Sequence, residues 1–382
     1  MRRLALVTAL LAGTIAGAAA TSALRDGEVT VVLPPATVAA IDREPVPAPR
    51  GGVLLVWTTG GLPAGMADRV AATGMGPVSA VSADTVWMTG STDTSGRPVD
   101  VLDAGFAIPL DAVAFDCETW SPLVPLAEAT AVCALGPGEA LLGATSARLR
   151  RLDRGGTITL DGGRELRVAG VIADEAVGAA ELVLASADAP AAGVRTERYV
   201  LVQFEGDRSA AEHEIRAAVG DMAVRVRGPG ETPWLRHGDA VLPPSVLKVT
   251  FGEWSARRLG GGRLELDAAW MAEWLVSVDM PVLGRIRCHR DLVPVLRSAL
   301  TELADRGLLE TIDRTASGCW NPRTIAGGDH PSRHAWGAAV DLVPMPAAPG
   351  LVEVMERWGL TWGGRWLDPD PVHFEFVRAG KP

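Results

Sequence analysis

Length, composition and charge narrow the classes of protein to which this chain can belong. At 382 residues, with 48% hydrophobic and 21% charged residues, it is long enough for two or three domains and apolar enough to build their cores. Its net charge of −10 argues against a nucleic-acid partner, because phosphates are bound by basic surfaces. The sequence shows no internal repeat and no run of like charges.

The first 23 residues, "MRRLALVTALLAGTIAGAAATSA", have the pattern of a secretory signal: two arginines, an apolar run and then small residues. The apolar run 4–20 is long for a signal core and slightly short for a membrane span, so a cleaved signal and an uncleaved anchor both remain open. Either alternative places the bulk of the chain outside the cytoplasm, secreted or anchored to the outer face of the cytoplasmic membrane. Residues 24–52 are rich in proline and small residues and are expected to form a linker.

Residues 53–245 are expected to form one domain of mixed α and β structure. The pattern over 156–174 predicts two strands joined by an Asp-Gly-Gly turn. A helix is predicted over 209–220, with Ser209 as its cap and His213 on its solvated surface. Further strands are predicted over 82–88, 180–186, 198–204 and 222–228.

Residues 139–185 resemble the extracytoplasmic core domain of ABC-transporter permeases of the macrolide-exporter and cell-division type. The membrane helices of such permeases are missing. The resemblance therefore implies a module that meets a protein partner or positions the rest of the chain, without transport activity and without a part in the chemistry.

The four cysteines form an even set, which outside the cytoplasm favours disulfides. Of the three pairings that four cysteines allow, Cys117–Cys133 with Cys288–Cys319 joins the nearest neighbours and keeps each bridge within one expected domain. A zinc site made of cysteines would need a C-x-x-C spacing, which is absent.

Residues 246–382 are expected to form the second domain, and nine of the twelve tryptophans lie between Trp234 and Trp366. An amphipathic helix is predicted over 291–310, and the alternation over 311–320 predicts a strand. The small residues of 337–342 predict another strand, as does the alternation over 372–376.

His334 and Asp341 stand out in "HPSRHAWGAAVDL", residues 330–342, because a turn followed by a strand can bring the two side chains to one point. A catalytic zinc ion usually has three protein ligands and one open position, so a third ligand is needed. We favour His373, which lies in "WGGRWLDPDPVHFEF", the only histidine-containing stretch rich in both acids and aromatics. The other candidates are His213, His237, His289 and His330.

A metal-dependent hydrolysis also needs a general base. Asp370 lies three residues before His373 on a turn stiffened by Pro369 and Pro371. Glu375 is the rival, on the same strand face as His373. We favour Asp370 as the base and Glu375 as a hydrogen-bond partner that orients a ligand imidazole.

At residues 250–382 the sequence is similar to the M15 zinc peptidases of the bacterial cell wall, which comprise D-alanyl-D-alanine carboxypeptidases, D,D-dipeptidases and L-alanyl-D-glutamate endopeptidases. The shared motifs are S-x-H-x-x-G-x-A-x-D, which starts at Ser332, and W-G-G-x-W followed by D-x-x-H-F-E. The resemblance implies a small zinc-peptidase fold with an antiparallel sheet, so the chain is expected to be α+β, with two α+β domains after the signal or anchor.

The resemblance also implies one zinc ion, held by His334, Asp341 and His373, and Asp370 as the base. It implies that Arg323 holds a carbonyl or carboxylate of the substrate and that Ser332 bonds substrate near the metal. Trp336 either packs in the core or forms a wall of the site that contacts substrate.

The expected function is therefore zinc-dependent hydrolysis of peptidoglycan stem peptides. Asp in the base position favours the endopeptidase branch, since dipeptidases and many carboxypeptidases have Glu there, and the scissile bond stays open. The alternative is a catalytically silent wall-binding or regulatory protein that docks a partner through residues 53–245.

Overall fold

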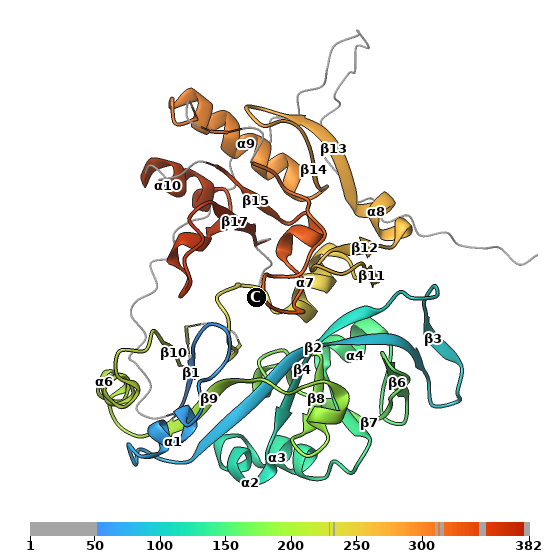
Figure 1. Cartoon of the computed structure of the whole chain (residues 1–382), viewed down its shortest axis with the longest axis vertical. Coiled ribbons are helices and arrows are strands. Elements are labelled where there is room, and N and C mark those ends of the chain that lie inside the picture. Colours follow the sequence, from blue (N-terminus) through green and yellow to red (C-terminus); the bar gives the residue numbers. More distant parts are fainter. Residues whose placement is uncertain are drawn as a thin grey trace, which may run out of the picture. The chain divides into compact units, whose positions relative to one another are not determined.

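The structure is a computed structural model that describes residues 52–377, apart from 229, 232, 233, 310, 311, 314–316 and 344–348. The expected signal or anchor over 1–23 and the linker up to residue 51 lie outside the described residues. The fold is mixed α and β with a sheet-rich body (Figure 1). Contacts join the described residues into one unit, and the division at residue 245 stays a prediction. In this part of the chain, no helix is both long enough and apolar enough to cross a membrane.

A ten-stranded sheet forms the body, in the order β10-β1-β9-β2-β4-β8-β5-β7-β6, with β3 paired to β2. A further pairing of β2 with β6 closes six of these strands into a ring, whose interior is filled by apolar side chains such as Met88, Leu110 and Leu166. The strands are β1 (Gly52–Trp57), β2 (Val78–Thr92), β3 (Pro98–Val101), β4 (Ile108–Phe115), β5 (Glu139–Gly143), β6 (Thr157–Leu160), β7 (Glu165–Ile172), β8 (Leu182–Ala185), β9 (Glu197–Phe204) and β10 (Arg225–Arg227).

Short helices cover the outer faces of this sheet. Trp120, Leu123 and Val132 pack α2 and α3 onto one side, and Ile215 packs α6 onto another. The helices are α1 (Met66–Ala71), α2 (Cys117–Trp120), α3 (Leu126–Cys133), α4 (Ala144–Arg150), α5 (Ala189–Ala192) and α6 (Arg208–Val219). All the strands predicted in this half of the sequence are present.

The helix predicted over 209–220 is α6, but the prediction of Ser209 as its cap is wrong. The helix begins at Arg208, and the side chain of Asp207 accepts a hydrogen bond from the backbone N–H of Ala210 at 2.9 Å. Asp207 has the extended backbone of a cap residue, whereas Ser209 already lies within the first turn.

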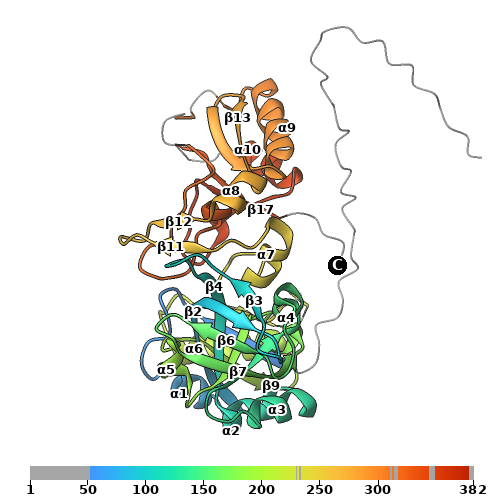
Figure 2. The same ribbon diagram turned by 90° about the vertical axis from the view of Figure 1, so that its right-hand side faces the viewer.

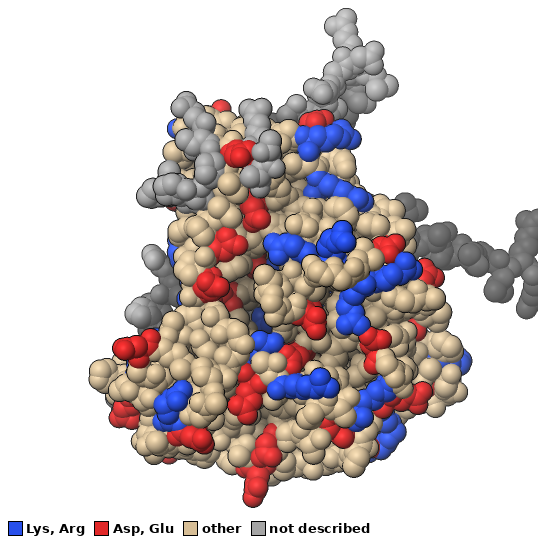
Figure 3. Space-filling model, in the orientation of Figure 1, with Lys and Arg blue, Asp and Glu red and all other residues tan. Residues whose placement is uncertain are grey.

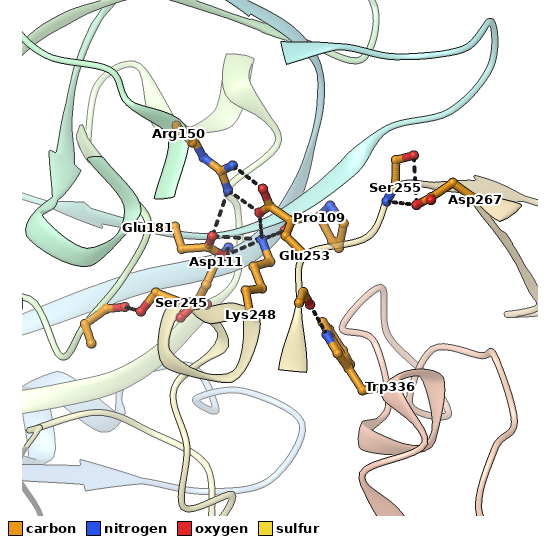
Figure 4. A network of polar contacts seen from close by, with 12 residues as sticks. Pro109, Asp111, Arg150, Glu181, Ser245, Lys248, Glu253, Ser255, Asp267 and Trp336 are labelled. Carbon is orange, nitrogen blue, oxygen red and sulfur yellow. Dashed lines mark hydrogen bonds and ion pairs between the residues drawn. The ribbon is translucent and has the colours of Figure 1, made fainter. Parts of the chain in front are cut away.

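Helix α7 (Pro244–Phe251) connects the sheet-rich body to the C-terminal part, and it lies between them in both ribbon views (Figure 2). Lys248 of α7 and Glu253 after it meet Arg150 and Glu181 from the body in a buried cluster of two cations and two anions (Figure 4). The four N–O contacts are 2.8–3.1 Å long, and the side chains are between 0% and 13% exposed. Each buried charge is compensated only while all parts of the cluster are in place.

One hydrophobic core runs through the C-terminal part and includes Trp87 and Ala107 of the sheet-rich body. Helix α9 (Leu292–Asp305) corresponds to the predicted amphipathic helix and buries Leu296, Leu300 and Leu303. A three-stranded antiparallel sheet, in the order β15-β17-β16, lies beside it. The remaining elements are β11 (Ala256–Arg258), β12 (Leu264–Leu266), α8 (Ala268–Trp274), β13 (Leu275–Met280), β14 (Gly284–His289), β15 (Ala339–Asp341), α10 (Pro349–Arg357), β16 (Leu360–Trp362) and β17 (His373–Phe376).

The strand predicted over 311–320 is wrong for the residues that the structure describes there, which form no strand. Gly318 makes only an isolated bridge with Asp341. Cys319 in this stretch is buried and bonded to Cys288.

Both cysteine pairs are the ones that the sequence predicts. The sulfur atoms of Cys117 and Cys133 are 2.00 Å apart, and those of Cys288 and Cys319 are 2.08 Å apart. The first bridge joins α2 to α3, and the second joins β14 to the segment that precedes Arg323.

Candidate metal centre

His334, Asp341 and His373 come together at one point of the C-terminal sheet. Asp341 on β15 is the direct strand partner of His373 on β17. His334 lies on a short 3-10 helix, Arg333–Trp336, which ends at Gly337 with φ 63°, a left-handed conformation that favours glycine. A side chain at Gly337 would also collide with the backbone nitrogen of His289, so glycine is required there for the chain to turn from His334 into β15.

Each of the three side chains directs one nitrogen or oxygen atom toward the other two. Nε2 of His334 lies 3.1 Å from Oδ1 of Asp341 and 3.1 Å from Nδ1 of His373, and the last two atoms are 3.0 Å apart. Nδ1 of His334 lies 2.5 Å from the carbonyl oxygen of Cys319. A carbonyl only accepts, so Nδ1 carries the proton of a neutral His334 and Nε2 offers a lone pair.

The pKa shifts of His373 and Asp341 indicate that the Asp341 carboxylate is balanced by a positive charge. Burial lowers the pKa of His373, but the hydrogen bond with Asp341 and the negative charges of Asp341 and Glu375 outweigh burial and raise that pKa to about 9. Burial raises the pKa of Asp341, but the two imidazoles outweigh it and hold the pKa well below its usual range. Without another cation, a proton on His373 therefore neutralises the carboxylate.

The donor set fits zinc. Ligands held about 2.0–2.2 Å from a tetrahedral zinc ion lie roughly 3.3 Å from one another. The three donor atoms are 3.0–3.1 Å apart and include two imidazoles and one carboxylate. Among the described residues, this is the only group of three or more His, Cys, Asp or Glu residues placed to share an ion. His334, Asp341 and His373 could therefore hold a metal ion and leave a fourth position open.

Glu375 is placed to orient a ligand. Its Oε1 lies 3.6 Å from Nε2 of His373 and 3.7 Å from Nε of Arg333, and its side chain is 7% exposed. Burial raises its pKa, but the nearby His373 and Arg333 outweigh burial and lower it. A carboxylate held ionised between two partners is suited to fixing the His373 ring. Arg333 was not predicted as a site residue from the sequence, although it is adjacent to His334.

Asp370 and Arg323 both line the cavity beside the cluster. Among the described residues, the Asp370 carboxylate makes no hydrogen bond or ion pair. The backbone carbonyl of Arg323 accepts from the N–H of Ser332 at 2.9 Å, which places Arg323 next to the segment that carries His334. Ser332 caps the 3-10 helix through a hydrogen bond of 3.3 Å from the His334 N–H to its Oγ.

Trp336 is mainly a packing residue at the base of the site. It is 2% exposed, its indole N–H donates to the carbonyl of Gly252 at 3.1 Å, and its ring lies 4.6 Å from that of Trp254. The remaining histidines do not join the cluster. His213 is exposed on α6, His289 is buried against Phe251, and His330 bonds Thr85 at 2.7 Å.

The cavity beside the metal cluster has a volume of about 600 Å³ and is lined by both halves of the chain. No local motif in the sequence marks the residues before 245 that line this cavity, so their part in it was not predicted. On the face shown in Figure 3, acidic and basic side chains are interspersed. A ligand would therefore interact with individual charges near it rather than with a surface of one sign of charge. The lining residues from the first half include Trp57, Thr85, Asp111, Arg198, Arg236, His237 and Asp239.

Comparison with known protein families matches residues 326–376 to an M15 peptidase family described as D-alanyl-D-alanine carboxypeptidase. The matched segment contains all three metal-ligand candidates together with Asp370 and Glu375. No curated protein matches the chain significantly. The match supports an M15-family peptidase domain at the C-terminal end of the chain, and a peptidase activity at the level of the family.

Proposed function

We propose that this chain is a zinc-dependent peptidase that hydrolyses peptidoglycan stem peptides. The observation that carries the proposal is the meeting of His334, Asp341 and His373 in a geometry fit for zinc, inside a segment similar to M15 peptidases. When bound, zinc supplies Lewis-acid activation of water and of a peptide carbonyl.

The side chains around the cluster have distinct roles in this proposal. Asp370 faces the cavity and takes a proton from the attacking water, then delivers it to the leaving amine. Arg323 holds the carbonyl oxygen or a carboxylate of the substrate. Glu375 and the carbonyl of Cys319 hold the rings of His373 and His334 in place.

The scissile bond is one of two. The matched family is described as D-alanyl-D-alanine carboxypeptidase, whereas Asp at position 370 favours the L-alanyl-D-glutamate endopeptidase branch. We further propose that the chain works outside the cytoplasm, secreted or held at the membrane by its N-terminus. Residues 53–245 would meet a protein partner there.

Digestion of purified peptidoglycan, followed by mass spectrometry of the released peptides, tests the function and identifies the bond. The proposal expects soluble products from the native protein, none after chelation, and recovery when zinc is restored. Asp370→Asn is the matched control, because it should retain zinc yet release nothing. Release that persists without metal would contradict a zinc peptidase, and no release with zinc bound would favour the alternative of a silent wall-binding or regulatory protein.

A further inference from the structure

Both halves of the chain line the cavity beside the metal cluster, and the segment 234–240 supplies part of one wall through its residues 236–240. This segment is tied to the loop that leads to Asp370. The carboxylate of Asp239 accepts from the backbone N–H of Leu367 at 2.6 Å, and Arg225 donates to the carbonyl of Arg365 at 2.8 Å. Segment 234–240 and Asp370, the candidate for the base, therefore line the same cavity.

Arg236 is fixed in this wall by its backbone. Its carbonyl accepts a hydrogen bond of 3.0 Å from Arg227, and the preceding Leu235 packs into the core of the sheet. Gly178 lies so close that a Cβ there would be 2.5 Å from the carbonyl oxygen of Leu235 and 2.9 Å from the Cβ of Arg236. The backbone and Cβ of Arg236 are thus held in position in this wall before any ligand binds.

The charge of Arg236 is poorly compensated. Its side chain is 13% exposed, and its ion pair with Asp111 is long, at 3.9 Å from Nη2 to Oδ2. Within the described part of the chain, Nε and Nη1 are buried with no hydrogen-bond partner. A desolvated cation with one distant carboxylate is destabilising unless a further anion approaches it.

His237, the next residue, adds a polar group to the same wall. Its ring stacks on Tyr199 with centroids 5.4 Å apart, and it makes no hydrogen bond within the described residues. Burial lowers its pKa well below the usual value, and the charges of Arg236, Arg198 and Arg227 lower it further. Arg236, Arg198 and Arg227 are therefore near enough to this ring to attract an anionic ligand, in a cavity that Asp111 and Asp239 also line.

We propose that Arg236 and His237 form a carboxylate-binding subsite, so that an acidic peptide is held by both halves of the chain while its scissile bond lies at the metal cluster. The inference rests on the proposed function and extends it to the substrate class. Stem peptides offer two such groups, the α-carboxylate of D-glutamate and the terminal carboxylate. Both groups are carboxylates, and the one that binds at this subsite would not contact the three metal ligands.

The test uses the full chain and the peptide L-Ala-γ-D-Glu-L-Lys-D-Ala-D-Ala in four forms: free acid, amidated at D-glutamate, amidated at the C-terminus, and amidated at both. Binding to zinc-free protein is measured by calorimetry, and hydrolysis by zinc-loaded protein is measured separately. Arg236→Gln should weaken binding of the free acid by about tenfold or more, raising KM with kcat little changed. The form whose amidation removes this difference identifies the carboxylate.

Two further variants provide a second test of the subsite and a control. His237→Phe retains the ring stacked on Tyr199 but removes its nitrogens, and it should weaken binding of the same carboxylate form severalfold. Arg195→Gln is the matched control, an exposed arginine of the same half that lies outside the cavity, and it should bind like the native chain. Thermal unfolding verifies that each variant is folded.

The outcomes separate the inference from the proposed function. Hydrolysis by the native chain combined with an Arg236→Gln variant that binds all four forms normally, or weakens all four equally, overturns the subsite alone. Carboxylate-dependent binding that needs Arg236, without hydrolysis of any form, overturns the peptidase proposal alone. A native chain that neither binds nor hydrolyses the peptide overturns both.

Discussion

His334, Asp341 and His373 converge on one point, so removal of any of them should release the metal, whereas removal of the base should not. His334→Ala, Asp341→Ala and His373→Ala are each expected to lose zinc and activity. Asp370→Asn should keep about one zinc per chain and lose about 10²–10⁴-fold in turnover. Metal analysis and peptide hydrolysis verify this together.

Two results would contradict these assignments. Full zinc retention in two of the three alanine variants would exclude this ligand set. If Glu375→Gln keeps zinc and is inactive while Asp370→Asn remains active, then Glu375 is the base.

The Cys288–Cys319 bridge has a second expected role, because the carbonyl of Cys319 fixes the ring of His334. Replacing both cysteines by alanine should weaken zinc binding about 10–100-fold, the usual effect of losing a partner that orients a metal ligand. The matched control is the double alanine variant at Cys117 and Cys133, far from the cluster in sequence. Both variants should lose about 2–5 kcal/mol of stability, but only the first should lose zinc affinity. Equal zinc affinity in the two variants would show that the bridge does not hold His334.

At the scale of elements, α7 is the connection on which the arrangement depends. Lys248→Met leaves Glu181 and Glu253 buried with Arg150 as their sole cation among the described residues, so it should lower the free energy of unfolding by about 3–5 kcal/mol. Chemical denaturation measures the loss. The control is Arg285→Gln, which breaks a pair with Asp279 whose side chains are 68% and 79% exposed and should cost less than about 1 kcal/mol. A similar small loss in both variants would mean that the cluster does not stabilise the fold.

At the scale of the whole molecule, residues 53–245 were expected to stay outside the chemistry, but we propose that they take part in substrate binding because they line the cavity. The core of the C-terminal part includes Trp87 and Ala107, and the cavity loses its wall if the first half is removed. A fragment of residues 246–382 should therefore unfold at a lower temperature than the full chain. It should also hydrolyse soluble stem peptides more than tenfold more slowly, a barrier change above about 1.4 kcal/mol. A fragment with native stability and native rates would show that the two halves are independent after all.

The sequence by itself predicted local parts of the protein: several strands, helices α6 and α9, the two cysteine pairs, and candidates for the metal ligands and the base. These depend on short-range chemistry, since residue alternation predicts strands and the spacing of His334, Gly337 and Asp341 lies within one turn and one strand. The tertiary structure alone decided that Cys319 fixes His334, that Arg333 pairs with Glu375, and that Arg236 and His237 border the metal cavity. Those contacts join segments up to well over one hundred residues apart. No periodicity along the chain specifies them. The first two depend on packing within the C-terminal part, and the third depends on α7 and the buried cluster around Lys248, which connect the two halves of the chain.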